Sequence, residues 1–326
     1  MCTRIDPEPQ RILVAIKPAS SGLPLAAVRA REVAHSVAGE ILLVSVVFDS
    51  VVAGGLEGAE ALEPAAKSRL IEDQRLELER TAQSLRDWGA SVTVQVVWDA
   101  AVYRGIVRVA EEWRATLLVV GAHEHRAMLP TSLTDTHWRL MDACTCPLLV
   151  VKSSVAIERR TILAAIDPSR VESRAVARHV LRAARYFGDA LHCQVRAVHA
   201  FPEPESFALA SAVEVSPGVF YGTENIAALH RRVVEELASG YGIDPGHADV
   251  RAGEPAAVIR HLMTEHDVGF VVLGLSRHSL LEQVVLGSIT QAVTSESLRD
   301  VLLIPQPSPR MQESSVTASA HVSASQ

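Results

Sequence analysis

The side chains best suited to chemistry follow two apolar, strand-like segments in the second half of the chain. Asp167-Pro168-Ser169 comes directly after residues 160–166, and Gly274 closes residues 270–274, with Gly287-Ser288 farther along the chain. A carboxylate at a strand end can accept hydrogen bonds from ribose hydroxyls. A Gly-Ser pair that opens a helix offers free N–H groups, a hydroxyl donor and the helix dipole to a phosphate. These residue types therefore indicate a nucleotide site.

Each of these short segments also has an ordinary structural explanation. Asp-Pro-Ser is a common turn and helix-start sequence, and Gly-Ser is a common helix entry. In an open parallel sheet, however, ligands bind beyond the carboxyl ends of the strands, where the strand order reverses. The combination of Asp167, Gly274 and Gly287-Ser288 at such loops favours nucleotide binding over capping alone.

An internal repeat provides the elements that position these residues. Three apolar segments recur at an offset of about 150 residues, which is the pattern of a duplicated domain. The matched pairs are residues 11–16 and 160–166, 117–121 and 270–274, and 147–151 and 301–304.

Helical patterns lie between these strands in both copies. Residues 25–38 are followed by Gly39, and residues 172–187 by Gly188, as helices often end at glycine. The residues Ile226, Leu229, Val233 and Leu237 share one helical face that should cover a sheet. Because βαβ crossovers are right-handed, the strands should be parallel. We predict an α/β fold of two tandem doubly wound domains, each a five-stranded parallel sheet flanked by helices.

The predicted organisation has four parts joined by a short linker. Residues 1–10 form an N-terminal tail, residues 11–152 the first domain and residues 160–306 the second domain. Residues 307–326 are rich in Ala and Ser and carry too little apolar surface to fold, so we expect a disordered tail.

The composition and the termini exclude several kinds of partner. The 31 basic and 38 acidic residues are interspersed and give a net charge of −7, so no basic stripe exists for nucleic acid. The N-terminus lacks the apolar region of a secretory signal, and no apolar run reaches the length of a membrane span. We therefore expect a cytoplasmic protein with neither nucleic acid nor membrane as partner. The four cysteines are too few and too uneven for a disulfide framework and are expected to be buried or free thiols.

A resemblance to a known family becomes specific at the second strand end. Gly274-x2-Arg277-x9-Gly287-Ser288 resembles the G-x2-G-x9-G-[S/T] signature of the ATP-binding universal stress proteins, and Gly253-Glu254-Pro255 also resembles that family's pattern. The resemblance implies an adenine-nucleotide alpha hydrolase-like fold that binds ATP, with or without Mg²⁺, or a related adenine nucleotide. The site residues that it implies are Asp167, Ala200, Leu273, Gly274, Arg277, Gly287, Ser288 and Ile289.

The roles within this set also follow from the resemblance. Asp167 would contact the nucleotide, and the backbone of Ala200 and Leu273 would face the adenine and ribose. Residues 287–289 would hold the phosphates. Arg277 departs from the signature, because it replaces the second glycine. It blocks the easiest close approach but brings a guanidinium near the phosphates, and a surface arginine without a ligand is the alternative.

The first copy departs further from the signature. Lys17 replaces the expected Asp, Glu124 the second glycine, and Thr134-Asp135 the Gly-Ser pair, so this nucleotide site is degenerate. The chain resembles the tandem E-type subgroup most closely, through residues 121–126 and the side chains of Trp98, Thr136, His137, Trp138 and Cys144. The resemblance implies that the last strands of the two domains, residues 148–151 and 301–304, pair with each other. It leaves homo-oligomers and protein partners open.

Other chemistry is less well supported. His123 and His125, with Asp99 or His137, are a candidate metal set, although loop histidines more often bond backbone. Cys144 is expected in the core rather than as a ligand or nucleophile. No catalytic triad, carboxylate pair or Walker motif is present, so no catalytic residues are predicted, and slow ATP hydrolysis is the most that we expect.

The sequence therefore predicts a stress-response protein that acts as a nucleotide-dependent sensor or adaptor. The alternatives are a nucleotide-free interaction scaffold with a pseudo-dimeric fold and, less favoured, a metal-dependent protein that uses His123 and His125.

Overall fold

A computed structural model describes residues 10–17, 22–54, 63–122, 133–169, 171–201, 223–275, 277–280, 283–286 and 288–305. The elements of the first half are β1 (Arg11–Ala15), α1 (Leu25–Val37), β2 (Glu40–Val47), α2 (Ser50–Gly54), α3 (Glu63–Arg86), β3 (Ser91–Trp98), α4 (Val102–Glu112), β4 (Leu117–Gly121), α5 (Asp135–Ala143) and β5 (Leu148–Val151).

The second half repeats this order with a few additions. Its elements are β6 (Thr161–Ala165), α6 (Val171–Ala190), β7 (Gln194–Phe201), α8 (Thr223–Ser239), η1 (Pro245–His247), β8 (Ala248–Ala252), α9 (Pro255–Glu265), β9 (Val268–Leu275), β10 (Arg277–Leu280), β11 (Gln283–Leu286), α10 (Ser288–Glu296) and β12 (Asp300–Pro305).

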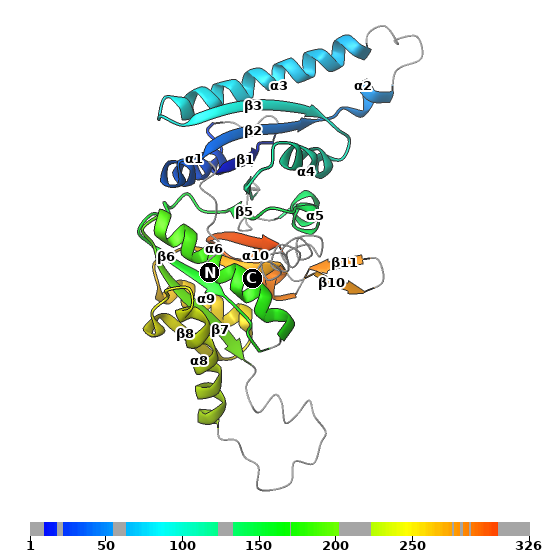
Figure 1. Cartoon of the computed structure of the whole chain (residues 1–326). Helices are drawn as coiled ribbons and strands as arrows, with labels where there is room; N and C mark the ends of the chain where they lie inside the picture. Colours follow the sequence, from blue (N-terminus) through cyan, green and yellow to red (C-terminus); the bar gives the residue numbers. More distant parts are fainter. Residues whose placement is uncertain are drawn as a thin grey trace, which may run out of the picture.

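Ten of the described strands form one sheet, in the order β3-β2-β1-β4-β5-β12-β9-β6-β7-β8. Within each half every pairing in this sheet is parallel, and both halves have the same 3-2-1-4-5 strand order. Helices cover both faces of the sheet (Figure 1). The predicted fold class, two tandem doubly wound α/β domains, is confirmed.

The two halves meet through their last strands. β5 and β12 pair antiparallel, with Leu149 opposite Leu302 and Leu148 opposite Leu303. These leucines are at most 3% exposed. The strand pairing implied by the family resemblance is therefore confirmed, and it covers an edge of each five-stranded sheet that would otherwise be open to other chains.

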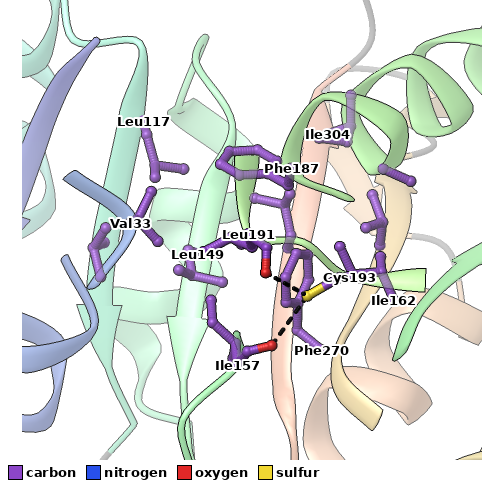
Figure 2. Packing of buried hydrophobic residues seen from close by; sticks show 14 of the residues in the cluster. Val33, Leu117, Leu149, Ile157, Ile162, Phe187, Leu191, Cys193, Phe270 and Ile304 are labelled. Atoms are coloured by element: carbon purple, nitrogen blue, oxygen red, sulfur yellow. Dashed lines mark hydrogen bonds between the residues drawn. The ribbon is translucent and has the colours of Figure 1, made fainter. Parts of the chain in front are cut away.

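Each face of the sheet carries one hydrophobic core that continues from one half into the other. Helices α1, α3, α6 and α8 bury one core, and α4, α5, α9 and α10 bury the other. Figure 2 shows the first core where Leu149 approaches the second half. There the rings of Phe187 and Phe270 pack edge to face, with their centroids 6.2 Å apart. Continuous apolar packing therefore supports the backbone pairing of β5 with β12.

A buried ion pair also joins the halves. Nε of Arg29 on α1 donates to Oδ2 of Asp300 at 2.6 Å, and the two side chains are 4% and 0% exposed. Oδ1 of Asp300 accepts the backbone N–H groups of Lys152 and Ser153 at 2.8 and 2.9 Å. The Arg29 guanidinium also donates to the carbonyl oxygens of Ser153 and Val155. The segment after β5 is thus fixed between α1 and the start of β12.

The side chain of Lys152 fixes the end of α10. Its Nζ donates to the carbonyl oxygens of Ser295 and Ser297, at 3.3 and 3.0 Å, and to that of Thr294. Burial lowers the pKa of Lys152 to about 8, and the negative charge of Asp300 opposes the shift. A cation at a helix C-terminus also interacts favourably with the helix dipole.

One local prediction was wrong, and another was confirmed only in part. Helix α6 continues through Gly188 to Ala190. A Cβ at Gly188 would lie 2.5 Å from Cγ2 of Val195 on β7. This glycine therefore permits helix–strand packing rather than ending the helix. On α8, Ile226 and Leu237 of the predicted face pack against the core, but Leu229 is 63% exposed, and Val234 and Ala238 are fully buried instead.

Among the described helices, none combines the length and the apolar character that crossing a bilayer requires.

Candidate functional site

The predicted site residues gather at the carboxyl edge of the second half. Strand order reverses between β6 and β9, whose registers place Ala165 beside Leu273. Ala165 also pairs with Val198 on β7, two residues before Ala200. Asp167 follows β6, and Gly274 is the penultimate residue of β9. These side chains and backbone groups lie at the topological switch point, where doubly wound proteins bind ligands.

Asp167 is exposed and has one carboxylate oxygen committed to its own turn. Oδ1 accepts the backbone N–H of Ser169 at 3.1 Å and its hydroxyl at 2.5 Å. Oδ2 receives no hydrogen bond from the described residues. The turn that the sequence offered as the ordinary explanation is therefore present, and it fixes the carboxylate so that its second oxygen is unbonded within the described part of the chain.

Gly274 allows β9 and α6 to approach closely. A Cβ at this position would lie 2.2 Å from Cγ1 of Val176 on α6. The Gly274 carbonyl accepts the Thr290 hydroxyl at 3.2 Å, which ties the first turn of α10 to the strand end. The glycine thus has a packing role that the sequence interpretation did not include, and its carbonyl positions the helix start.

The segment after β9 contains a hairpin. β10 and β11 pair antiparallel with Arg277 opposite Leu286, so Arg277 lies beside the residues that precede α10. Ser288 is the first residue of that helix, and Ile289, the next, is 42% exposed. Gly287 lies outside the described residues, as do the side-chain positions of Arg277 and Ser288. The backbone arrangement brings Arg277 and the α10 N-terminus together although they are far apart in the signature.

The first half has a different arrangement at the matching positions. Lys17 follows β1 and is exposed, and α5 begins at Asp135. Nε2 of His137 lies 3.0 Å from the Gly121 carbonyl, and its Nδ1 lies 3.1 Å from the Thr134 N–H. Since a carbonyl only accepts, Nε2 carries the proton and Nδ1 accepts. His137 thus ties α5 to the end of β4, as Thr290 ties α10 to β9.

The candidate metal set is only partly described. His123, Glu124 and His125 lie outside the described residues. Oδ1 of Asp99 accepts the Ala101 N–H at 2.9 Å, and Oδ2 lies 3.6 Å from Nη1 of Arg108. Asp99 and His137 therefore both make local structural contacts.

Cys144 lies in the core, as predicted. It is 1% exposed at the C-terminal end of α5, and its Sγ lies 3.4 Å from Sγ of Cys146. This hydrogen bond, together with burial, raises the pKa of Cys146. The described cysteines, Cys144, Cys146 and Cys193, carry no disulfide.

Sequence reasoning missed a histidine pair beside the candidate site. Nδ1 of His199 on β7 lies 3.1 Å from the Ile166 carbonyl, and its Nε2 lies 2.8 Å from Nδ1 of His230 on α8. The His230 ring stacks on His199 and Phe201, with centroid distances of 5.0 and 4.7 Å. Burial lowers the pKa of His199. The signal was available, because His199 is a polar residue within an otherwise apolar strand end.

The strand order, the antiparallel join and the clustered groups at a switch point define a class of protein. It is a tandem α/β protein with an adenine-nucleotide alpha hydrolase-like fold. The sequence pattern of the Universal stress protein family matches residues 8–152 and 158–305. The chain therefore belongs to the universal stress protein family, in which it is a tandem two-domain member of the E type.

Relatives and solved structures agree with this assignment. The chain is 22% identical to Universal stress protein E of Photorhabdus laumondii over 312 residues, which cover 90% of this chain and 94% of the relative. It is 23% identical to Universal stress protein E of Escherichia coli over 305 residues, which cover 90% of this chain and 93% of the relative.

Two solved structures share the fold. A putative universal stress protein from Pseudomonas aeruginosa has a TM-score of 0.69 at 20% identity and covers 92% of this chain and 94% of its own. A universal stress protein from Archaeoglobus fulgidus has a TM-score of 0.62 at 16% identity, with 90% and 98% covered.

Proposed function

We propose that this universal stress protein binds ATP or a related adenine nucleotide in its second domain and acts in the stress response as a nucleotide-dependent sensor or adaptor. Membership of the family supports the stress-response role. The observation that carries the nucleotide proposal is the convergence of Asp167, the end of β9 and the start of α10 at one switch point.

Each group has a role that its chemistry suits. The open Oδ2 of Asp167 is available to a ribose hydroxyl, and the backbone near Ala200 and Leu273 borders the space for the base. The first N–H groups of α10 lack partners within their own helix and favour an anion. Residues 287–289 would take the phosphates, with Mg²⁺ where the nucleotide carries it, and the hairpin brings Arg277 beside them. No catalytic role is assigned, so any ATP hydrolysis would be slow.

The test is isothermal titration of the full-length protein with ATP and Mg²⁺. The wild type should show one site, and Asp167→Ala and Gly287→Glu should each lose it while circular dichroism shows intact folding. The matched control is Lys17→Ala, at the corresponding position of the first domain, which should bind as the wild type does. Wild type that binds no adenine nucleotide would refute the proposal and leave the interaction scaffold as the better account.

A further inference from the structure

The end of β6 is held by a side chain where its pairing with β7 stops. The N–H of Ile166 donates to the Val198 carbonyl at 2.9 Å, as a parallel ladder requires. The next bond of such a ladder would join the Ala200 N–H to the Ile166 carbonyl, and the described backbone groups do not make it. The Ile166 carbonyl instead lies 3.1 Å from Nδ1 of His199. The imidazole therefore takes the place of a backbone donor at the point where β6 and β7 separate.

The bond to His199 fixes the peptide that leads into Asp167. Because a peptide unit is planar, the direction of the Ile166 carbonyl also sets the positions of the N and Cα atoms of Asp167. On the other strand, the Ala200 N–H points toward β6, because alternate strand residues direct their backbone groups to the same side and Val198 bonds to Ile166. One imidazole thus fixes the start of the Asp167 turn and prevents the backbone bond that would bring the two strand ends together.

The contacts of the His199 ring define where its proton lies. Since a carbonyl only accepts, Nδ1 of His199 carries the proton and donates to Ile166. Burial lowers the pKa of His199, so the ring is neutral and its Nε2 accepts. Nδ1 of His230, 2.8 Å away, is then the donor to Nε2. The His230 ring also stacks on His199 and Phe201, so α8 holds the imidazole in this orientation.

The first domain has a different residue at the matching position. The N–H of Ile16 donates to the Val44 carbonyl at 2.8 Å, which reproduces the bond at the end of β6. The residue that corresponds to His199 is therefore Ser45, whose Oγ is buried and makes no hydrogen bond with the described atoms. The residue after Ile16 is Lys17. The imidazole thus occurs in the domain whose first strand is followed by an aspartate, and a short side chain replaces it where a lysine follows.

We propose that His199, oriented by His230, is a positioning residue of the second-domain nucleotide site. It acts through the Ile166 carbonyl, which sets where Asp167 presents its carboxylate to a ribose and keeps the Ala200 N–H available to the base. This inference rests on the proposed function and adds to it two residues that lie outside the family signature. They give the second domain a preformed strand end that the first domain lacks.

The test compares two amide replacements by isothermal titration of the full-length protein with ATP and Mg²⁺. In His199→Asn, Nδ2 occupies the place of the imidazole Nδ1 and can still donate to the Ile166 carbonyl. In His199→Gln, the amide reaches the place of Nε2 and can bond His230 but not Ile166. His199→Asn should bind ATP within about threefold of the wild type, and His199→Gln roughly tenfold more weakly than the wild type, because the bond to Ile166 is lost.

Thermal unfolding separates positioning from stability. Each replacement removes one of the two ring bonds, so the two variants should lose similar stability. A role of His199 in packing alone would weaken ATP binding equally in both. The matched control is His179→Gln on α6, where Nδ1 lies 2.7 Å from the backbone carbonyl of Ala175. This control should bind ATP as the wild type does.

A second pair of variants applies if the buried position accepts neither amide. His230 is only partly buried, and His230→Asn keeps a donor in the place of Nδ1, whereas His230→Leu has nearly the same shape without the donor. His230→Leu should bind ATP about threefold or more weakly than His230→Asn, because the His199 ring loses the bond that orients it.

The outcomes distinguish this inference from the proposed function. Wild type that binds ATP, with equal affinities in His199→Asn and His199→Gln, overturns the inference and leaves the proposed function standing. Equal affinities in the two His230 variants do the same if the first pair does not fold. Wild type that binds no adenine nucleotide refutes the proposed function and this inference with it.

Discussion

Replacement of Asp300 by asparagine should destabilise the whole molecule, because this fully buried carboxylate is one of the two that pair with Arg29, the other being Glu32. The asparagine keeps the shape and one acceptor oxygen for the N–H groups of Lys152 and Ser153. In the wild type, Nε of Arg29 lies 2.6 Å from Oδ2 of Asp300, and the Arg29 side chain is only 4% exposed. In the variant, an NH₂ donor would face the Nε donor of Arg29. A buried charge that loses its only partner costs about 3–5 kcal/mol. Because Arg29 keeps its ion pair with Glu32, the loss should lie at or below the lower end of that range.

The assay is urea unfolding followed by two signals. All four tryptophans, Trp88, Trp98, Trp113 and Trp138, lie in the first half, so their fluorescence reports on that half alone, while far-UV circular dichroism reports on both. Because Asp300 lies in the second half and Arg29 in the first, Asp300→Asn should lower the unfolding midpoint of both signals.

Two further variants test the reasoning. Glu72→Gln breaks an exposed ion pair with Arg75 and should change little, since exposed pairs contribute little. Adding Arg29→Met to Asp300→Asn removes the guanidinium that faces the new amide donor, so the double variant should lose clearly less stability than the sum of the single losses. The reasoning is refuted if Asp300→Asn behaves like Glu72→Gln, or if the two losses simply add.

Three further predictions follow from other contacts. Gly274→Ala should cost about 1–3 kcal/mol, because its Cβ would lie 2.2 Å from Cγ1 of Val176, and Val176→Ala should restore most of that loss in thermal unfolding. Lys152→Met should cost about 1–3 kcal/mol, because it leaves buried carbonyls at the end of α10 without their donor, and should increase amide exchange in that helix. Burial lowers the pKa of His199, so the unfolded chain takes up a proton below about pH 6.5 that the folded protein resists. Stability should therefore fall as the pH drops through that region, and less steeply in His199→Phe, which keeps a ring against His230.

Each of these has a result that contradicts it. A Gly274→Ala protein as stable as the wild type would mean that α6 moves away at no cost. Unchanged exchange in α10 of Lys152→Met would mean that its terminal carbonyls find other partners. Equal pH dependence of unfolding in His199→Phe and the wild type, measured between pH 7 and 5, would mean that burial of this imidazole does not affect its protonation.

The sequence by itself determined the architecture of this protein. The repeated apolar segments at residues 11–16 and 160–166, with helical patterns between strands, sufficed to predict two tandem doubly wound domains. The prediction succeeds because buried strands and amphipathic helices each require a particular spacing of apolar residues along a short stretch of sequence. The same patterns, combined with the family resemblance, predicted that β5 and β12 pair.

Only the tertiary structure decided what several individual residues do. Gly188 has the sequence context of a helix stop, yet the side chain of Val195, on the next strand, gives it a packing role. Leu229 belongs to a plausible apolar stripe but is exposed, because contacts with β7 and β8 set the rotation of α8. The spacing of apolar residues cannot show which face of a helix is buried when two neighbouring faces both carry apolar side chains.

The candidate sites show the same division. Asp167 and Gly274 were predicted as site residues from the sequence, because strand ends and a spaced signature mark them locally. The His199–His230 pair and the buried Arg29–Asp300 ion pair join segments far apart in the chain. Their partners are set by how helices pack on the sheet, and that depends on the summed fit of many side chains, which no local pattern records.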